Sequence, residues 1–101
     1  MIAKIYNYSG WLTVTNPPTL DKVFSDMLAE SDFHVLGQIA YNFTPQGFTK
    51  LWLLGESHFA VHTFPERGKT YFELSSCNDI MYNKFVGMIK ELEVNYGTTE
   101  D

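Results

Sequence analysis

The segment spanning residues 54–66, LGESHFAVHTFPE, gathers reactive side chains in a chain region that is otherwise apolar and aromatic. It contains Ser57, whose hydroxyl can act as a nucleophile, and His58 and His62, which can act as bases or metal ligands. Two glutamates flank these residues, and Cys77 follows twenty residues after the serine. These residue types suggest three chemistries: metal binding, hydrolysis by a serine–histidine pair, or a reaction specific to this arrangement.

The two histidines do not have the spacing of a metal site in an extended segment. His58 and His62 are four residues apart, which on a helix is the spacing of a zinc-binding pair. The intervening residues are typical of a strand, in which four residues span ~13 Å, far beyond the ~4 Å that two ligands of one metal tolerate. We therefore expect no metal ion at this segment.

A serine hydrolase is also disfavoured by the local pattern. Ser57 lacks the Gly-x-Ser-x-Gly sequence of a nucleophile elbow. In a regular strand Ser57 and His62 point to opposite faces and lie ~16 Å apart, so they should not meet within one chain. By residue type alone, Cys77 could equally be a buried packing residue, and each histidine a hydrogen-bonded part of the scaffold.

Length and composition predict one soluble domain covering residues 1–101. The chain is 45% hydrophobic and 19% charged, which is enough apolar material for one core. Its net charge of −5, without a lysine or arginine cluster, argues against a nucleic-acid partner. The sequence has no apolar run of ~20 residues and no signal-peptide order at its start, so we expect no membrane partner and a cytoplasmic location.

The first elements are predicted to be a strand and a helix. Residues 2–8 are rich in isoleucine and tyrosine and predict a strand that ends at Ser9-Gly10. Asn16-Pro17-Pro18 predicts a turn before the helix. The helix is indicated by apolar residues that recur on one helical face, namely Leu20, Val23, Phe24, Met27 and Leu28.

Residues 33–77 change to runs of β-branched and aromatic residues and predict four further strands. The breaks between them are expected at residues 45–47, 55–58 and 65–68. Asp79 can cap a second helix that ends at Gly97, and residues 97–101 look frayed. The apolar stripe of this helix is Met81, Phe85, Met88 and Leu92.

The predicted fold is therefore α+β, in the order β-α-β-β-β-β-α. The simplest packing is a two-layer sandwich in which both helices cover one face of an antiparallel sheet. The strands carry apolar residues at both parities, among them Leu51 and Trp52. Because the second face would then be apolar and exposed, we expect the sheets of two subunits to pack together in a dimer.

Two longer stretches resemble a known family. NFTPQGFTKLWLLGESHFAVHTFPE and FELSSCND are similar to the proenzymes of bacterial and archaeal S-adenosylmethionine decarboxylases. The pattern of that family runs Phe-Ser-Pro-Gln-Gly, Glu-Ser-His, Ile-His-Thr-Trp-Pro-Glu and Thr-Cys-Gly-Asp. The resemblance covers roughly residues 41–79, with the family's spacing of five residues from Ser57 to His62, twenty to Cys77 and eight back to Thr49.

This resemblance implies a zymogen that makes its own cofactor by autocatalytic cleavage. Ser57 would attack the Glu56 carbonyl, and the chain would split between residues 56 and 57 into 1–56 and 57–101, leaving a covalent pyruvoyl group derived from Ser57. Thr49 stands where the family has a serine that assists this step, and His62 matches the histidine of processing. Such a step needs a strained backbone and a group that stabilises an oxyanion.

The resemblance also implies how catalysis would proceed. The pyruvoyl carbonyl would form a Schiff base with the substrate and act as electron sink, without metal or pyridoxal phosphate. Cys77 would donate the proton, Phe43 would stack on the adenine, and Glu66 would hold the ribose. Phe64, where the family usually has tryptophan, would also lie at the substrate. The family's single-domain members are dimers with composite sites, so Ser57 of one subunit would meet His62 of the other.

The function implied is decarboxylation of S-adenosylmethionine to the aminopropyl donor for spermidine biosynthesis. Two alternatives stay open at the level of sequence. Related pyruvoyl enzymes act on arginine or ornithine instead. A non-catalytic paralogue that binds a nucleoside would also retain the fold, and Thr49 and the unfamiliar first forty residues are the features that favour it.

Overall fold

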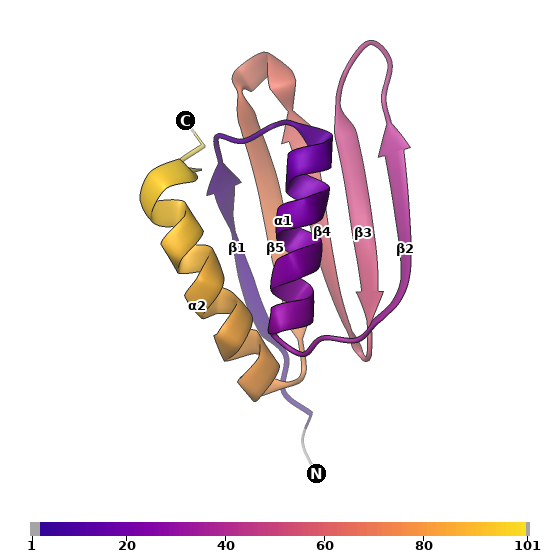
Figure 1. Ribbon diagram of the computed structural model, residues 1–101, viewed down its shortest axis with the longest axis vertical. Helices are drawn as coiled ribbons and strands as arrows, with labels where there is room; N and C mark the ends of the chain where they lie inside the picture. Colours follow the sequence, from indigo (N-terminus) through magenta and orange to yellow (C-terminus); the bar gives the residue numbers. More distant parts are fainter. Residues whose placement is uncertain (1–2, 101) are drawn as a thin grey trace.

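Two helices lie side by side against one face of a single antiparallel sheet (Figure 1). The computed structural model describes residues 3–100. The elements in this range are β1 (Tyr6–Leu12), α1 (Pro17–Glu30), β2 (Val35–Asn42), β3 (Phe48–Leu54), β4 (Ser57–Phe64), the 3-10 turn η1 (Pro65–Arg67), β5 (Lys69–Ser76), α2 (Asp79–Tyr96) and β6 (Gly97–Thr98). The strand order in space is β2-β3-β4-β5-β1-β6. The predicted α+β class and the two-layer packing are confirmed.

Strand β1 runs further than the sequence predicted. It extends through Ser9-Gly10 to Leu12 and pairs with β5, while Ile2 lies outside the described residues. Gly10 is not a stop signal, because it pairs with Phe72 of β5 inside the strand, and a Cβ at this position would lie 2.8 Å from the Phe72 ring. The glycine therefore allows the core aromatic to pack close to the strand.

Helix α1 begins inside the expected turn. Asn16 is the N-cap and its side chain accepts the backbone N–H of Thr19 at 3.0 Å. Pro17 and Pro18 form the first turn of the helix, where the missing N–H groups cost no hydrogen bond. The predicted helical face is confirmed, since Leu20, Phe24, Met27 and Leu28 are buried.

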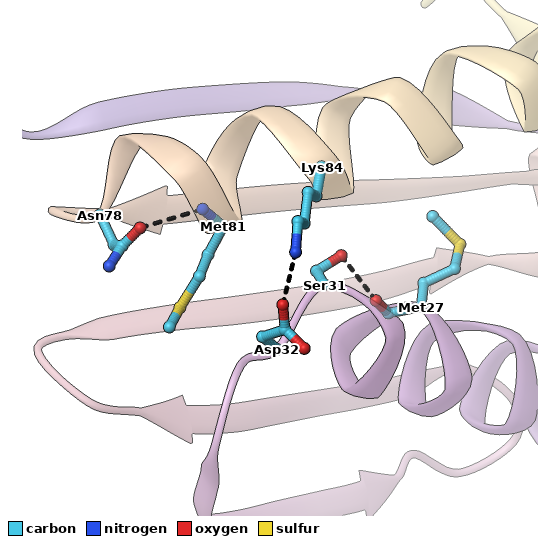
Figure 2. Close-up of polar contacts among 6 residues, drawn as sticks. All are labelled: Met27, Ser31, Asp32, Asn78, Met81 and Lys84. Atoms are coloured by element: carbon cyan, nitrogen blue, oxygen red, sulfur yellow. Dashed lines mark hydrogen bonds and ion pairs between the residues drawn. The ribbon is translucent and has the colours of Figure 1, made fainter.

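Figure 2 shows how the end of α1 is tied to α2. The buried hydroxyl of Ser31 donates to the Met27 carbonyl at 2.7 Å, which satisfies one of the last carbonyls of the helix. The next residue, Asp32, accepts a hydrogen bond from Lys84 of α2 at 2.6 Å. These contacts fix the two helices relative to each other at the end where α2 begins.

Helix α2 is capped one residue earlier than predicted. Asn78 is the N-cap, and its Oδ1 accepts the backbone N–H of Met81 at 2.9 Å (Figure 2), so Asp79 is the first helical residue. The buried stripe is centred on Phe85 and Ile89, whereas Met81, Met88 and Leu92 are partly buried at its edges. Gly97 ends the helix, as expected.

The end of the chain is more ordered than the sequence suggested. Residues 97–98 form β6 and pair with Trp11 and Leu12 of β1. Arg67 forms an ion pair with Glu100, and Lys69 donates to the Thr99 carbonyl at 2.6 Å. The predicted fraying is therefore wrong for residues 97–100, because backbone and charged groups of the sheet hold them; Asp101 lies outside the described residues.

The two faces of the sheet differ sharply in burial. The helix-covered face carries the aromatic core, including Trp52, Phe59 and Phe72, each at most 1% exposed. The open face carries Ile39 of β2, which pairs with Leu51 of β3, and Leu53 two residues further along β3, with exposures of 70%, 41% and 58%. The predicted apolar residues at both parities are confirmed.

Candidate active site

The turn between β3 and β4 has only two residues, Gly55 and Glu56, because Leu54 and Ser57 already pair across it. Strand β4 therefore begins at Ser57, inside the segment 55–58 that the sequence predicted to be a break. Glu56 has φ of 52°, in the left-handed region that residues with a Cβ adopt at a cost of about 1 kcal/mol. The backbone strain expected next to Ser57 is thus observed on its amino-terminal side.

Ser57 points to the helix-covered face of the sheet and is 7% exposed. Its hydroxyl donates to the hydroxyl of Ser76 at the end of β5, at 3.1 Å. The Ser76 oxygen also accepts the backbone N–H of Asn78 at 3.1 Å. The candidate nucleophile is therefore a buried, hydrogen-bonded hydroxyl.

Cys77 lies between β5 and α2 and is half-buried. Its sulfur is 3.8 Å from the Oε2 atom of Glu56, within reach of a weak S–H hydrogen bond. Glu56 and Cys77, 21 positions apart in the sequence, are thus brought together by the β4–β5 pairing. We refer to Glu56, Ser57, Ser76 and Cys77 as the serine group.

Thr49 and His62 form a second group, called here the histidine group. They face each other across β3 and β4, and the Thr49 hydroxyl lies 2.9 Å from Nδ1 of His62. The imidazole is nearly parallel to the ring of Tyr71 on β5, with 6.4 Å between centroids. His62 alternates with the buried residues of β4 and therefore points to the open face.

The two groups do not meet within the chain. Ser57 and His62 stand at opposite ends of β4 and on opposite faces of the sheet, separated along the strand by ~16 Å. In Figure 1 the β3–β4 turn lies at the lower end of the sheet, near the start of α2, and the β4–β5 connection lies at the upper end. The prediction that Ser57 and His62 do not meet within one chain is confirmed.

The remaining predicted site residues lie towards the end of the histidine group. Phe43 follows β2 and is 50% exposed, and its ring centroid lies 4.9 Å from that of Tyr41. Glu66 belongs to η1 and accepts a hydrogen bond from Gln46 at 3.4 Å. Phe64 is the last residue of β4 and is 38% exposed, and its ring centroid lies 5.8 Å from that of Trp11.

Two side chains with shifted pKa values lie outside both the serine group and the histidine group. Burial, followed by a hydrogen bond to Glu93 of α2, raises the pKa of Tyr8 to about 12. A hydrogen bond from the buried Lys50 at 2.6 Å lowers the pKa of Asp21 on α1. Both pairs join a helix to the covered face, so these shifts reflect packing of the scaffold.

Between residues 3 and 100, no three side chains of histidine, cysteine, aspartate or glutamate gather closely enough to hold a metal ion. In the same range no helix combines the length and hydropathy needed to cross a bilayer.

Comparison with known proteins adds to this geometry. The family model described as S-adenosylmethionine decarboxylase matches residues 3–96. The chain belongs to the S-adenosylmethionine decarboxylase family. The resemblance of residues 41–79 to that family is therefore confirmed, and it extends over nearly the whole chain.

Individual relatives agree with the S-adenosylmethionine decarboxylase family. The S-adenosylmethionine decarboxylase proenzyme of Clostridium kluyveri is 28% identical over 79 residues, which cover 78% of this chain and 62% of the relative. The proenzyme of Brevibacillus brevis is 47% identical over 45 residues, which cover 45% of this chain and 34% of that protein. The chain thus spans about 62% of the length of its Clostridium relative.

A solved structure supports the S-adenosylmethionine decarboxylase fold. The crystal structure of the adenosylmethionine decarboxylase from Aquifex aeolicus superimposes with a TM-score of 0.71 at 19% identity, covering 90% of this chain and 82% of that one. At this identity the match concerns the fold.

One residue of the serine group was missed by the sequence reasoning. Ser76 was not singled out, although it contacts the Ser57 hydroxyl directly. The available signal was strand parity, since the β4–β5 pairing of His58 with Ser75 places Ser57 opposite Ser76. The family pattern carried a second signal, because Thr-Cys-Gly-Asp has a hydroxyl residue directly before its cysteine, at the position of Ser76.

Proposed function

We propose that the chain is a self-processing, pyruvoyl-dependent decarboxylase that acts on S-adenosylmethionine and supplies the aminopropyl donor for spermidine biosynthesis. The observation that carries the proposal is the serine group: a buried hydroxyl directly after a left-handed Glu56, with a thiol 3.8 Å from the same glutamate. Membership of the S-adenosylmethionine decarboxylase family supports the same reading.

The first reaction in the proposal is cleavage of the peptide bond between Glu56 and Ser57. The Ser57 oxygen attacks the Glu56 carbonyl carbon, the C–N bond breaks, and the hydroxyl proton ends on the released amine. Elimination of the resulting ester and hydrolysis with loss of ammonia convert residue 57 to a pyruvoyl group. The left-handed turn residue supports this proposal, since strain at Glu56 is relieved when the bond is cut.

The histidine group assists this reaction in the proposal. His62 removes the Cα proton in the elimination, and the Thr49 hydroxyl stabilises the oxyanion of the cyclic intermediate. Their 2.9 Å contact supports a joint role, because a hydrogen bond at Nδ1 fixes the ring of His62. Since ~16 Å separate Ser57 and His62 along β4, the histidine group of a second subunit is needed.

A homodimer with composite sites follows from that requirement. The exposed side chains of Ile39, Leu51 and Leu53 on the open face support it, because so much contiguous apolar surface favours burial against a partner. Packing two such faces together brings the histidine group of one subunit, which lies on the same face, to the subunit boundary.

Residues of the chain also fit the proposed cofactor. Ser57 is its precursor, and Cys77 beside the same turn is placed to protonate the substrate carbon after CO2 leaves. A pyruvoyl group supplies a carbonyl that accepts the electrons released by decarboxylation. Because this electron sink is made from the chain itself, the proposal requires neither a metal ion nor pyridoxal phosphate.

Substrate recognition is assigned to the aromatic and acidic residues near η1. Phe43 stacks on the adenine, Glu66 accepts the ribose hydroxyls, and Phe64 borders the same site. Phe43 and Phe64 are 50% and 38% exposed, so their faces are accessible to a ligand. Aromatic faces also suit the positively charged sulfonium of S-adenosylmethionine.

Two measurements test the proposal. Mass spectrometry of the purified protein should find fragments 1–56 and 57–101, the second with a pyruvoyl terminus in place of serine. Release of labelled CO2 should then be strong with carboxyl-labelled S-adenosylmethionine and weak with arginine or ornithine. An intact chain in an active preparation would contradict the cleavage. Preference for arginine or ornithine would overturn the substrate, and a folded protein inert towards all three would indicate a non-catalytic paralogue.

A further inference from the structure

The hydroxyl of Ser57 has one defined polar contact on the neighbouring strand. Extending the β4–β5 register by one pair from His58 and Ser75 puts Ser57 opposite Ser76, and their oxygens are 3.1 Å apart. Ser76 is 0% exposed and Ser57 is 7% exposed. Water therefore has little access to this pair, and the orientation of each hydroxyl is decided by its protein neighbours.

The hydroxyl of Ser76 is itself held by Asn78. The backbone N–H of Asn78 donates to the Ser76 oxygen at 3.1 Å, and the Ser76 hydroxyl donates to the Asn78 carbonyl at 3.4 Å. Asn78 is in turn fixed as the N-cap of α2 through its bond to Met81 (Figure 2). A continuous series of hydrogen bonds thus connects Ser57 to the start of a rigid helix.

This arrangement determines which atom donates to which. Ser76 has one hydroxyl proton, and that proton is directed to Asn78. With its proton on the Asn78 carbonyl, Ser76 acts as an acceptor towards Ser57, whose hydroxyl donates across the 3.1 Å contact. The lone pairs of the Ser57 oxygen then point away from Ser76 and stay available for bond formation.

We propose that Ser76 is a positioning residue for self-cleavage: its oxygen accepts a hydrogen bond from the Ser57 hydroxyl and holds the nucleophilic oxygen in the orientation for attack on the Glu56 carbonyl. This inference rests on the proposed function. Ser76 forms no covalent bond and is not consumed, because the Ser57 hydroxyl proton that it orients ends on the amine of residue 57. The Ser57 oxygen leaves with fragment 1–56, so the task of Ser76 is finished once the chain is cut.

The test compares two variants of the same shape. Ser76→Thr keeps the hydroxyl and Ser76→Val replaces it with a methyl, so any crowding at this buried position is common to both. Ser75→Ala is the matched control, because the neighbouring serine of β5 points to the open face. Each full-length chain is made by cell-free synthesis, and the first-order rate constant of cleavage is followed by mass spectrometry.

We expect Ser76→Val to be cleaved more slowly than Ser76→Thr by roughly fivefold or more, which corresponds to loss of one hydrogen bond in the transition state. Ser75→Ala should match the unmodified chain. After complete cleavage, turnover per pyruvoyl-containing subunit should agree within about twofold between the threonine and valine variants, because the hydrogen bond no longer exists then.

Each alternative outcome is informative. Equal cleavage rates of the threonine and valine variants overturn the inference and leave the proposed function standing. A parallel loss of cleavage and turnover indicates a merely structural role and also overturns it. An unmodified chain that stays intact overturns both proposals. If the added methyl prevents folding, Ser76→Ala replaces the pair, and a folded Ser76→Ala chain with an unchanged cleavage rate overturns the inference.

Discussion

The serine group and the histidine group lie at opposite ends of the same strand pair but are built differently. The serine group combines a two-residue turn, a left-handed Glu56 and a buried hydroxyl linked to the start of α2. The histidine group is a single cross-strand pair on regular strands, on the open face of the sheet. One end is thus strained and enclosed, whereas the other is unstrained and faces outward.

This difference indicates a division of tasks. Strain and burial at the serine group suit a bond that is to be broken, and an outward-facing imidazole suits a base that acts on another molecule. We therefore expect the strained turn at the end of each sheet, next to Ser57, to meet the histidine group of the partner in the proposed dimer.

Substitutions within the serine group should separate cleavage from catalysis. Ser57→Ala removes the proposed nucleophile, so we expect neither cleavage nor CO2 release. Cys77→Ala should retain at least part of the cleavage but lose about 100-fold or more in turnover, because only the proton donor is missing. Mass spectrometry and labelled CO2 release measure the two effects. Identical behaviour of both variants would mean that the assigned roles are wrong.

Mixed dimers test whether the two groups act across subunits. His62→Ala alone should be cleaved at least ~100-fold more slowly, since it lacks the base. When it is co-expressed with Ser57→Ala, the chain carrying Ser57 can meet an intact His62 in its partner, and cleavage should return in mixed dimers. Mass spectrometry distinguishes the two chains. Cleavage that stays absent in verified mixed dimers would contradict composite sites.

A charge on the open face should prevent the two groups from meeting. Leu53→Glu places a carboxylate among the exposed apolar residues of β3, so we expect monomers and loss of cleavage. Val94→Glu is the control, because Val94 on α2 is 82% exposed and distant from the sheet face. Sedimentation velocity gives the oligomeric state. A dimeric, normally cleaved Leu53→Glu chain would exclude this face as the interface.

The contact within the histidine group should have an intermediate effect. Thr49→Ala removes the hydroxyl that lies 2.9 Å from His62, and we expect cleavage to slow by about tenfold. Thr49→Ser keeps the hydroxyl and should stay within about threefold of the unmodified chain. If alanine and serine gave equal rates, the hydroxyl would have no part in the reaction.

A change remote from both groups should alter stability alone. Tyr8 has its pKa raised to about 12, so its contribution to stability is complete below pH ~10 and is lost as the pH rises towards about 12. Tyr8→Phe should lower the free energy of unfolding by about 1 kcal/mol at neutral pH and flatten the decline above pH ~10. Denaturant unfolding at several pH values measures this, with cleavage unchanged. An equally steep alkaline decline in the variant would refute the role of Tyr8.

Local patterns predicted most of the fold, because periodicity depends on near neighbours. The buried face of α1 and the loop at residues 45–47 agree with the structure. The errors occur where a residue distant in the sequence determines the local structure. Gly10 lies inside a strand and packs against the ring of Phe72. Residues 97–98 join the sheet because they pair with the edge of β1. The capping of α2 by Asn78 instead of Asp79 is a one-residue error at a boundary.

The sequence by itself determined the family, the alternation that puts Ser57 and His62 on opposite faces, and the distance between them, since strand geometry fixes all residues of one segment together. Three features came from the tertiary structure alone: Glu56 is left-handed, Cys77 lies beside Glu56, and Ser76 accepts a hydrogen bond from Ser57. Those contacts depend on the register between β4 and β5 and on where α2 begins. Register and helix position are set by packing of the whole core, which no short stretch of sequence contains.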